Sequence, residues 1–509
     1  MRNPLRRRPH LIPSSVGLTA LLLAIITVGL AGAQGGAPAQ QHLLHLPLLS
    51  NGRATTQPEA ISFWGMNAYL SKRERISAGD NLLELARLAR EAGVAWTREE
   101  LPWDLIEPND DDFRGVYDAD LRLAAEQGFG IIGVLLTTPA WARDGTCAGN
   151  YWCPPADVNE YAEFAAWMVE RYDGDGRDDA PGSPRVAYWQ IWNEPNDTAL
   201  WPDIGGGPNA RKLRYGQLLV AAYQAIKAAD PTATVLSGGV YIYDGSCAGG
   251  LCDGLNFFNA EGGVFRQVPA ARQAFDIFAI HPYIPDRRPD DPAIPRIITV
   301  EGRIRNTRAW LDNPAVGRPD APLWISELGW CTAPGACPGG AQISEAQQAN
   351  YLVRSLVIAQ QNGVQHASWF QLEDAFNNPN RLWGNAAILR QYNGTTYPLK
   401  PAYVAYRTLA TQLAGAAPIG AGPLHTHSYD PANPFVGSGG TYNYRYTQGA
   451  TVIDVLWRPD DTLQVNLPVA AGATVTRVTI DGSATPLAPS GGTVSLTLSE
   501  EPIIVVQRR

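Results

Sequence analysis

Two glutamates, Glu194 and Glu327, lie at the ends of apolar runs with the composition of buried strands, VAYWQIWNEPN (186–196) and PLWISELGW (322–330). Pro195 cannot donate to a sheet ladder, so the first strand must end just past Glu194. Two carboxylates that face one cleft could hydrolyse a glycosidic bond. One stays protonated to donate to the leaving oxygen, and the other stays ionised to attack or to stabilise the oxocarbenium-like centre. For either glutamate alone, the alternatives are a helix cap or a salt bridge.

The elements that must position these glutamates form a repeating pattern. Short runs rich in β-branched and aromatic residues alternate with amphipathic helical stretches. Eight such strand–helix units predict an α/β fold, a closed (β/α)8 TIM barrel. A doubly wound open sheet is the alternative, but no G-x-G-x-x-G motif follows the first run. The predicted strands are 61–69, 94–103, 130–141, 186–196, 234–241, 275–283, 322–330 and 366–374.

The helical pattern stops after residue 413. Residues 420–509 alternate apolar and polar in short runs such as ATVIDVLW, TLQVNLPV, TVTRVTI, TVSLTLS and PIIVVQ, divided by Gly, Pro and Asp turns. This alternation predicts a small C-terminal β-sandwich domain. We favour a domain that packs on the barrel, and a sugar-binding role is the alternative.

The N-terminus has the layout of a secretory signal peptide. Four arginines precede the apolar run VGLTALLLAIITVGL (16–30), and the small residues Ala31-Gly32-Ala33 follow it. We expect secretion to the extracellular space and no membrane association after cleavage; an uncleaved anchor is the alternative. The predicted division is a signal peptide at 1–33, a Gly- and Pro-rich linker at 34–58, the barrel at 59–414 and the sandwich at 415–509.

The net charge of the chain indicates which classes of partner it can bind. Removal of 1–33 takes away four Arg and no acid, so the net charge changes from −9 to −13. An acidic protein is a poor partner for nucleic acid or anionic membranes, and a neutral substrate fits better. We expect a monomer.

The six cysteines form three close pairs that predict local disulfides, because the spacing does not suit zinc. The pairs are Cys147/Cys153, Cys247/Cys252 and Cys331/Cys337.

Polar residues gather at the predicted C-terminal strand ends, where barrels of this kind hold their working residues. These are Arg98, Asn193, Glu194, His281, Tyr283 and Glu327, with Trp369 on the eighth strand. Several tryptophans also fall at strand ends or in the loops after them. Indole faces stack on the apolar face of pyranose rings, so these tryptophans suit an oligosaccharide cleft. Trp64 and Trp141 are predicted to bind substrate in this way.

Several of these segments resemble one group of enzymes. WNEPN and WISELGW resemble the acid/base and nucleophile segments of clan A retaining glycoside hydrolases. AGVAWTREELPWDLIEP (92–108), AIHPY (279–283) and KPAYVAY (400–406) extend the resemblance over most of residues 61–413. The chain is most similar to family 39 and family 5 members with an appended β-sandwich. The third strand ends in TTPAW (137–141), without the histidine found there in many family 5 enzymes, which favours family 39.

The resemblance implies a role for each matching residue. Glu194 would be the general acid/base and Glu327 the nucleophile, with no cofactor or metal. Asn193 would bind the sugar 2-hydroxyl, and Arg98 would hold the nucleophile ionised, because a close cation lowers a carboxylate pKa. His281 or Tyr283 would orient a carboxylate, and Trp369 would be the floor of a sugar subsite.

The function that the resemblance implies is secreted retaining hydrolysis of β-linked oligo- or polysaccharides. One alternative is a carbohydrate-binding barrel that has lost catalysis, which turnover of an activated aryl glycoside would exclude. Another is a metal-dependent barrel hydrolase, which needs a histidine-rich cluster at the strand ends. The seven histidines are scattered along the chain, so this second alternative is disfavoured.

Overall fold

The computed structural model describes residues 61–71, 81–242, 253–259, 262–332, 337, 343–374, 383–430, 432–433 and 439–509. The predicted signal peptide and linker lie outside the described residues, as do Cys247 and Cys252. Among the described helices, none combines the length and apolar character that a membrane span requires.

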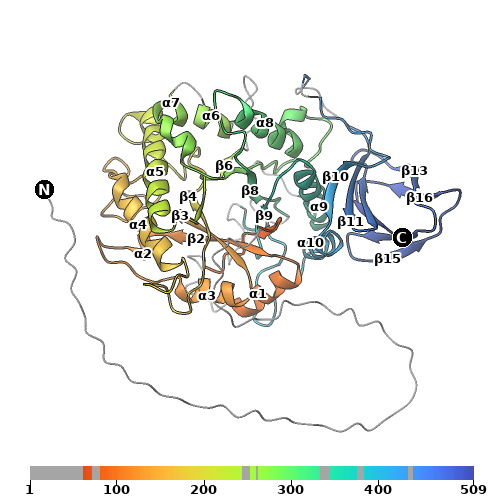
Figure 1. Ribbon diagram of the computed structural model, residues 1–509, viewed down its shortest axis with the longest axis horizontal. Coiled ribbons are helices and arrows are strands. Elements are labelled where there is room, and N and C mark those ends of the chain that lie inside the picture. Colours follow the sequence, from red (N-terminus) through yellow and green to blue (C-terminus); the bar gives the residue numbers. More distant parts are fainter. Residues whose placement is uncertain are drawn as a thin grey trace, which may run out of the picture. The chain divides into compact units, whose positions relative to one another are not determined.

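A parallel sheet forms the first part of the described chain, with helices around it (Figure 1). Its strand order is β5-β4-β3-β2-β1-β9-β8-β7-β6. Its two ends, β5 and β6, are consecutive pieces of one segment interrupted at residues 237–239. Bridges from Leu236 to Ile277 and from Asn193 to Gly239 join the segment to its neighbours on both sides. The sheet therefore closes, and the predicted TIM barrel is confirmed. Its strands are β1 (Trp64–Met66), β2 (Trp96–Pro102), β3 (Gly130–Leu136), β4 (Tyr188–Ile191), β5 (Thr234–Leu236), β6 (Val240–Tyr241), β7 (Phe278–His281), β8 (Leu323–Leu328) and β9 (Ala367–Trp369).

Helices connect the strands. Helix α1 buries one apolar stripe, whereas α9 is buried on all sides from Gln348 to Ala359. In α1 the buried residues Leu85, Ala86, Leu88 and Ala89 follow the i, i+3, i+4 spacing of an amphipathic helix. A capping box at Ser344 begins α9, because the Ser344 and Gln347 side chains each accept from the other's backbone amide. The helices are α1 (Leu82–Glu91), α2 (Trp103–Ile106), α3 (Asp118–Glu126), α4 (Val158–Arg171), α5 (Gly207–Ala229), α6 (Asp253–Asn259), α7 (Val264–Gln267), η3 (Pro269–Gln273), η4 (Arg296–Ile298), α8 (Val300–Asp312), α9 (Glu345–Gln361) and α10 (Pro401–Gln412).

Inside the barrel, the strand pleat sets which side chains point inward. Trp96, Tyr188 and Trp324, near the N-terminal ends of their strands, pack together as an aromatic layer. Because side chains alternate along a strand, Arg98 and Gln190, two residues further on, also face inward one layer nearer the catalytic end. The barrel floor is thus apolar, and a polar layer lies directly above it.

The C-terminal strands form the predicted sandwich. A six-stranded antiparallel sheet has the order β10-β11-β12-β17-β14-β15, and β13 pairs with β16 in a second sheet. All five predicted runs form strands, and β10, β11 and β15 join them. The strands are β10 (Ala417–Ala421), β11 (Tyr442–Gln448), β12 (Thr451–Trp457), β13 (Leu463–Pro468), β14 (Thr474–Thr479), β15 (Ala484–Leu487), β16 (Thr493–Leu498) and β17 (Ile503–Arg508).

Strand β17 contributes apolar side chains to both faces of the six-stranded sheet. In β17, Ile503 and Val505 join the core between the two sheets, whereas Ile504 and Val506 join the core that continues into the barrel. This alternation explains why the run PIIVVQ is apolar throughout. The contacts of Ile504 and Val506 agree with the expectation that the C-terminal domain packs on the barrel.

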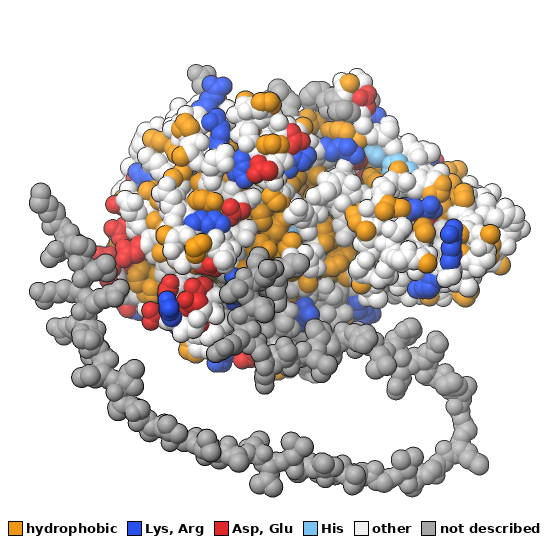
Figure 2. Space-filling view, in the orientation of Figure 1, with side chains coloured by type: hydrophobic (Ala, Val, Ile, Leu, Met, Phe, Trp, Pro, Cys, Tyr) orange, Lys and Arg blue, Asp and Glu red, His pale blue; other side chains and the backbone are white. Residues whose placement is uncertain are grey.

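On the face that Figure 2 shows, basic side chains are scattered in small groups rather than gathered into one patch.

Buried polar contacts also join the sheet to the barrel. Asp290 accepts a hydrogen bond from Trp457 Nε1 at 2.6 Å and pairs with the fully buried Arg354 of α9. Nearby, His427 Nε2 lies 2.7 Å from Glu301 Oε2 on α8. A guanidinium that is buried without a partner destabilises the fold. Because the sheet covers Arg354, its pairing with Asp290 is needed for the sheet to pack on the barrel.

We predict that Asp290→Ala lowers the free energy of unfolding by about 3–5 kcal/mol, because Arg354 would remain buried without its partner. Urea titration measures the loss. The control is Asp312→Ala, which removes an exposed i,i+4 pair with Arg308 and should cost less than about 1 kcal/mol. Equal losses for the two variants would contradict the importance of the buried contact.

Candidate active site

Six of the predicted site residues meet at the C-terminal end of the barrel. A carboxylate oxygen of Glu194, one of Glu327 and a ring nitrogen of His281 all lie within 4.8 Å of one another. Arg98 and Tyr283 contact Glu327, and Asn193 contacts Arg98. Only 8% of Glu194 and 6% of Glu327 is exposed. The strand ends therefore bring the two glutamates together in a nearly dry environment.

Local backbone irregularities aim both glutamates at this centre. The pairing of β8 with β9 shifts register between Ile325 and Leu328, and such a bulge re-aims the side chain of Glu327. On the fourth strand, Trp192 and Glu194 have φ values of 68° and 47°, in the left-handed region that costs non-glycine residues free energy. The Glu194 amide donates to Gly239 O at 3.1 Å, which fixes this turn.

Glu327 is held by a cation and a hydroxyl. Arg98 Nη1 donates to Oε1 at 2.8 Å, and the Tyr283 hydroxyl donates to Oε2 at 2.9 Å. Burial raises the pKa of Glu327 above its ordinary value, and Arg98 and Tyr283 oppose that rise by stabilising the anion. Of the two glutamates, Glu327 is the one whose charge is directly compensated.

Glu194 has a different environment. Its Oε1 lies 2.6 Å from His281 Nδ1, and burial lowers the pKa of His281 to about 4, so this partner is neutral. Burial, with a smaller contribution from the negative charge of Asp197, raises the pKa of Glu194 to about 8. At neutral pH the carboxyl of Glu194 therefore keeps its proton and can act as the acid. The contacts of Arg98 and Tyr283 favour the anion at Glu327, which suits it to act as the nucleophile.

Three buried residues that the sequence analysis missed complete the network. Asn67 Oδ1 accepts from Arg98 Nη1 at 2.7 Å, and Gln190 Oε1 accepts from Arg98 Nε at 3.0 Å. Ser326 Oγ lies 2.8 Å from His281 Nε2. The available signal was a polar residue inside an otherwise apolar strand, at the inward-facing position.

Two of the predicted aromatic contacts are wrong. Trp369 is fully buried and stacks on Trp330, because strand alternation turns it outward toward the helices. The next residue, Phe370, is half-buried and packs near Tyr283, a neighbour of Glu327. Trp64 also faces outward and packs edge-on against Tyr406 of α10. The first error is a shift of one residue in a pattern of period two. The second arises because Trp64 begins β1, at the end of the strand away from Glu194 and Glu327.

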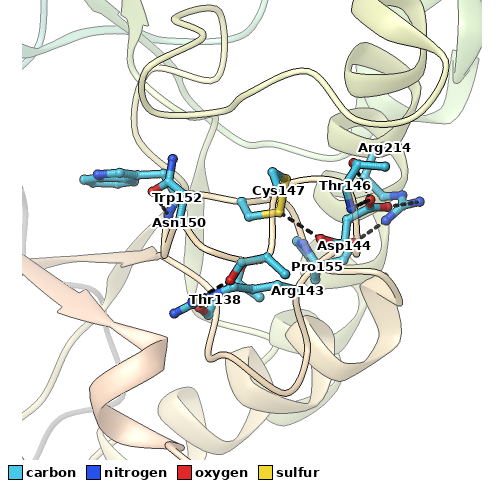
Figure 3. Close-up of a disulfide and its surroundings, with 11 residues drawn as sticks. Thr138, Arg143, Asp144, Thr146, Cys147, Asn150, Trp152, Pro155 and Arg214 are labelled. Atoms are coloured by element: carbon cyan, nitrogen blue, oxygen red, sulfur yellow. Dashed lines mark hydrogen bonds and ion pairs between the residues drawn. A yellow bond between two sulfur atoms is a disulfide. The ribbon is translucent and has the colours of Figure 1, made fainter.

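Trp141 lies half-buried in the loop after β3, where its Nε1 donates to Glu107 O at 3.1 Å. Its role as a substrate contact stays a prediction. The same loop contains the predicted disulfide between Cys147 and Cys153, which is confirmed. In Figure 3 the Trp152 side chain points away from the bridge, and Arg214 pairs with Asp144 on the opposite side.

The predicted bridge between Cys331 and Cys337 is not formed, because both residues are buried free thiols. A hydrogen bond with Cys337, and then burial, raise the pKa of the Cys331 thiol. The same hydrogen bond lowers the pKa of the Cys337 thiol.

The centre does not have the geometry of a metal site. Ligands at the 2.0–2.2 Å typical of zinc, arranged tetrahedrally, lie about 3.3 Å from one another. The Glu194 and His281 atoms are only 2.6 Å apart, which is a hydrogen-bond distance, and Arg98 already compensates Glu327. These donors fit a hydrogen-bonded acid and a compensated anion better than a metal-ligand set.

Comparison with solved structures identifies the fold. No protein-family model and no curated protein matches the sequence. A family 39 glycoside hydrolase from the gut symbiont Bacteroides cellulosilyticus WH2 matches with a TM-score of 0.61 and 19% identity, over 84% of this chain and 78% of that chain. The family 39 enzyme from Xanthomonas axonopodis pv. citri has a TM-score of 0.54 and 14% identity, over 91% and 99% of the two chains.

A third match is a wild-type family 86 glycoside hydrolase in complex with neoagarooctaose. Its TM-score is 0.56 at 14% identity, over 88% of this chain and 75% of that chain. At these identities the matches establish a shared fold, and they confirm at that level the resemblance to clan A seen in the sequence.

We predict that Glu194 carries a proton up to about pH 8. Because burial disfavours its anion, the protonated carboxyl should be lost only as the pH rises through that value. Infrared difference spectra recorded between pH 6 and pH 9 measure the change, and Glu194→Gln, which cannot titrate, is the control. A carboxyl signal that disappears near pH 4 would show that the environment does not hold the proton.

Proposed function

We propose that this protein is a retaining glycoside hydrolase that cleaves β-linked glycans by double displacement. The observation that carries the proposal is that one carboxylate oxygen of Glu194 and one of Glu327 lie within 4.8 Å of each other. Retaining enzymes place their two carboxyl groups about 5–5.5 Å apart, whereas inverting enzymes need about 6.5–9.5 Å to admit a water. The short separation supports direct attack by one carboxylate.

The environments of the glutamates assign the steps. In the first step, Glu194 gives its proton to the glycosidic oxygen while Glu327 attacks the anomeric carbon, so the sugar–oxygen bond breaks and a glycosyl ester forms. In the second, ionised Glu194 takes a proton from water, whose oxygen attacks the same carbon and releases Glu327. Formation of the ester removes the negative charge of Glu327, which lowers the pKa of Glu194 and suits it to act as the base.

Neighbouring groups support recognition of a sugar. Asn193 Oδ1 is occupied by Arg98 Nη2 at 2.7 Å, and its amide nitrogen has no partner among the described residues. That nitrogen is a donor for the 2-hydroxyl predicted from the sequence. Trp383 lies 4.5 Å from Tyr283 between ring centroids, and Phe370 packs against both. We assign to Phe370 and Trp383 the stacking role predicted for Trp369.

We also propose that the protein is exported and acts as a monomer on a neutral glycan. The signal-like N-terminal segment and the Cys147–Cys153 bridge support export, since disulfides persist in oxidising compartments. A binding barrel without catalysis is the competing proposal. The retained pair of glutamates argues against it, because keeping a strained and buried carboxylate at Glu194 costs stability that binding alone does not require.

We predict that the first product of a β-linked substrate is the β-anomer. Two successive inversions at the anomeric carbon restore its configuration, and proton NMR of the fresh reaction mixture distinguishes the anomers before they equilibrate. Suitable substrates are oligosaccharides from β-glucans, xylan and mannans. An initial α-anomer would refute double displacement.

We also predict that replacing Glu327 and replacing Glu194 by alanine abolish different steps of the reaction. Glu327→Ala should lose the first step for every substrate. Glu194→Ala should still react with dinitrophenyl β-glycosides, whose leaving group needs no protonation, and should fail with natural glycans.

Addition of azide distinguishes the Glu194→Ala variant from the Glu327→Ala variant. It should accelerate Glu194→Ala by attacking the glycosyl-enzyme from the vacated side, with the β-glycosyl azide as product. Rescue of Glu327→Ala alone would reverse the two roles, and full activity in both variants would place the active site elsewhere.

A further inference from the structure

His281 is held between two side chains from different strands. Its Nδ1 lies 2.6 Å from Glu194 Oε1, and its Nε2 lies 2.8 Å from Ser326 Oγ. His281 and Ser326 are completely buried. Each ring nitrogen thus has one hydrogen-bond partner, and the imidazole connects Ser326 to the acid/base.

Gly239 leaves the space that this arrangement needs. A Cβ atom at Gly239 would lie 2.1 Å from His281 Nε2 and 2.7 Å from Ser326 Oγ, so no other residue fits beside the pair. The carbonyl of Gly239 also accepts the Glu194 amide. One glycine therefore holds the backbone of the acid/base and seats the imidazole that contacts its side chain.

The donors and acceptors around His281 determine which ring nitrogen carries the proton. A neutral imidazole has one nitrogen that donates and one that accepts. Among the described residues, His281 Nε2 is the only acceptor within reach of the Ser326 hydroxyl. A buried hydroxyl that leaves its proton unpaired loses free energy, so Ser326 donates to Nε2. The ring proton is then on Nδ1, which donates to Glu194 Oε1.

We propose that Ser326 is a positioning residue that fixes the Nδ1–H tautomer of His281 and thereby keeps the transferable proton of Glu194 on Oε2. This inference rests on the proposed function. If Nδ1 were the acceptor, the Glu194 proton would lie on Oε1 and face the imidazole instead of the glycosidic oxygen. With Ser326 in place, the contact from Nδ1–H to Oε1 persists whether Glu194 is protonated or ionised.

The test compares Ser326→Ala with Ser368→Ala. Ser368 Oγ lies 2.8 Å from His366 Nε2 in an equally buried His–Ser pair, which the described contacts do not connect to either glutamate. Both variants lose the same kind of hydrogen bond. Nitrogen-15 NMR of histidine-labelled protein reports the tautomer directly, and the His281 signal is assigned by its loss in His281→Asn.

We predict an Nδ1–H tautomer at His281 in the wild type and in Ser368→Ala, and a substantial Nε2–H population in Ser326→Ala. For aryl β-glucosides and β-xylosides with poor leaving groups, kcat/KM of Ser326→Ala should fall about tenfold, because the acid is misdirected in part of the molecules. Dinitrophenyl glycosides should react at the wild-type rate, so the dependence on leaving group becomes steeper.

An Nε2–H tautomer in the wild type would overturn the proposal. Equal losses with good and poor leaving groups, or losses matched by Ser368→Ala, would also overturn it by showing a merely structural role. The NMR result does not depend on turnover. A wild type that hydrolyses no aryl glycoside would therefore defeat the proposed function, while the tautomer would still be measured.

Discussion

The buried guanidinium of Arg98 is the constraint on which the rest of the site depends. A charge taken out of water must recover its solvation from the protein, and Arg98 does so through Asn67 on the first strand segment, Gln190 and Asn193 on the fourth, and Glu327 on β8. These contacts join opposite sides of the barrel. The same hydrogen bonds therefore fix the strand ends and compensate the carboxylate proposed to attack the substrate.

The two glutamates share the charge of Arg98 unequally. Both carboxyl groups are buried, so both have raised pKa values, but only Glu327 has a cation in direct contact. Glu194 has a neutral imidazole instead. If Arg98 lay between the two glutamates, it would favour ionisation of both and leave no acid. The position of one guanidinium therefore separates the roles.

Much of this architecture was predictable because its signals are local. Most barrel strands are apolar runs bounded by turn residues, and both glutamates lie where such a run ends. The orientation of Trp369 was not predictable, because a one-residue uncertainty in register moves a side chain from the cleft to the helices. The bulge that aims Glu327 and the space beside Gly239 depend on residues distant in sequence. Asn67, Gln190 and Ser326 stand out in the sequence only as polar residues within apolar runs, and their partners are distant in sequence.

The apolar side chains that β17 contributes to both faces of the six-stranded sheet bear on how such proteins diversify. Appended domains are often exchanged between enzymes as independent modules, which requires a polar surface wherever the module meets its host. In this protein, Ile504 and Val506 of β17 belong to the core shared with the barrel, and Trp457 donates to a barrel carboxylate. A sheet cut away at this boundary would expose a broad apolar face and tend to associate with other chains. The barrel and its sheet are therefore expected to be inherited, duplicated and lost together.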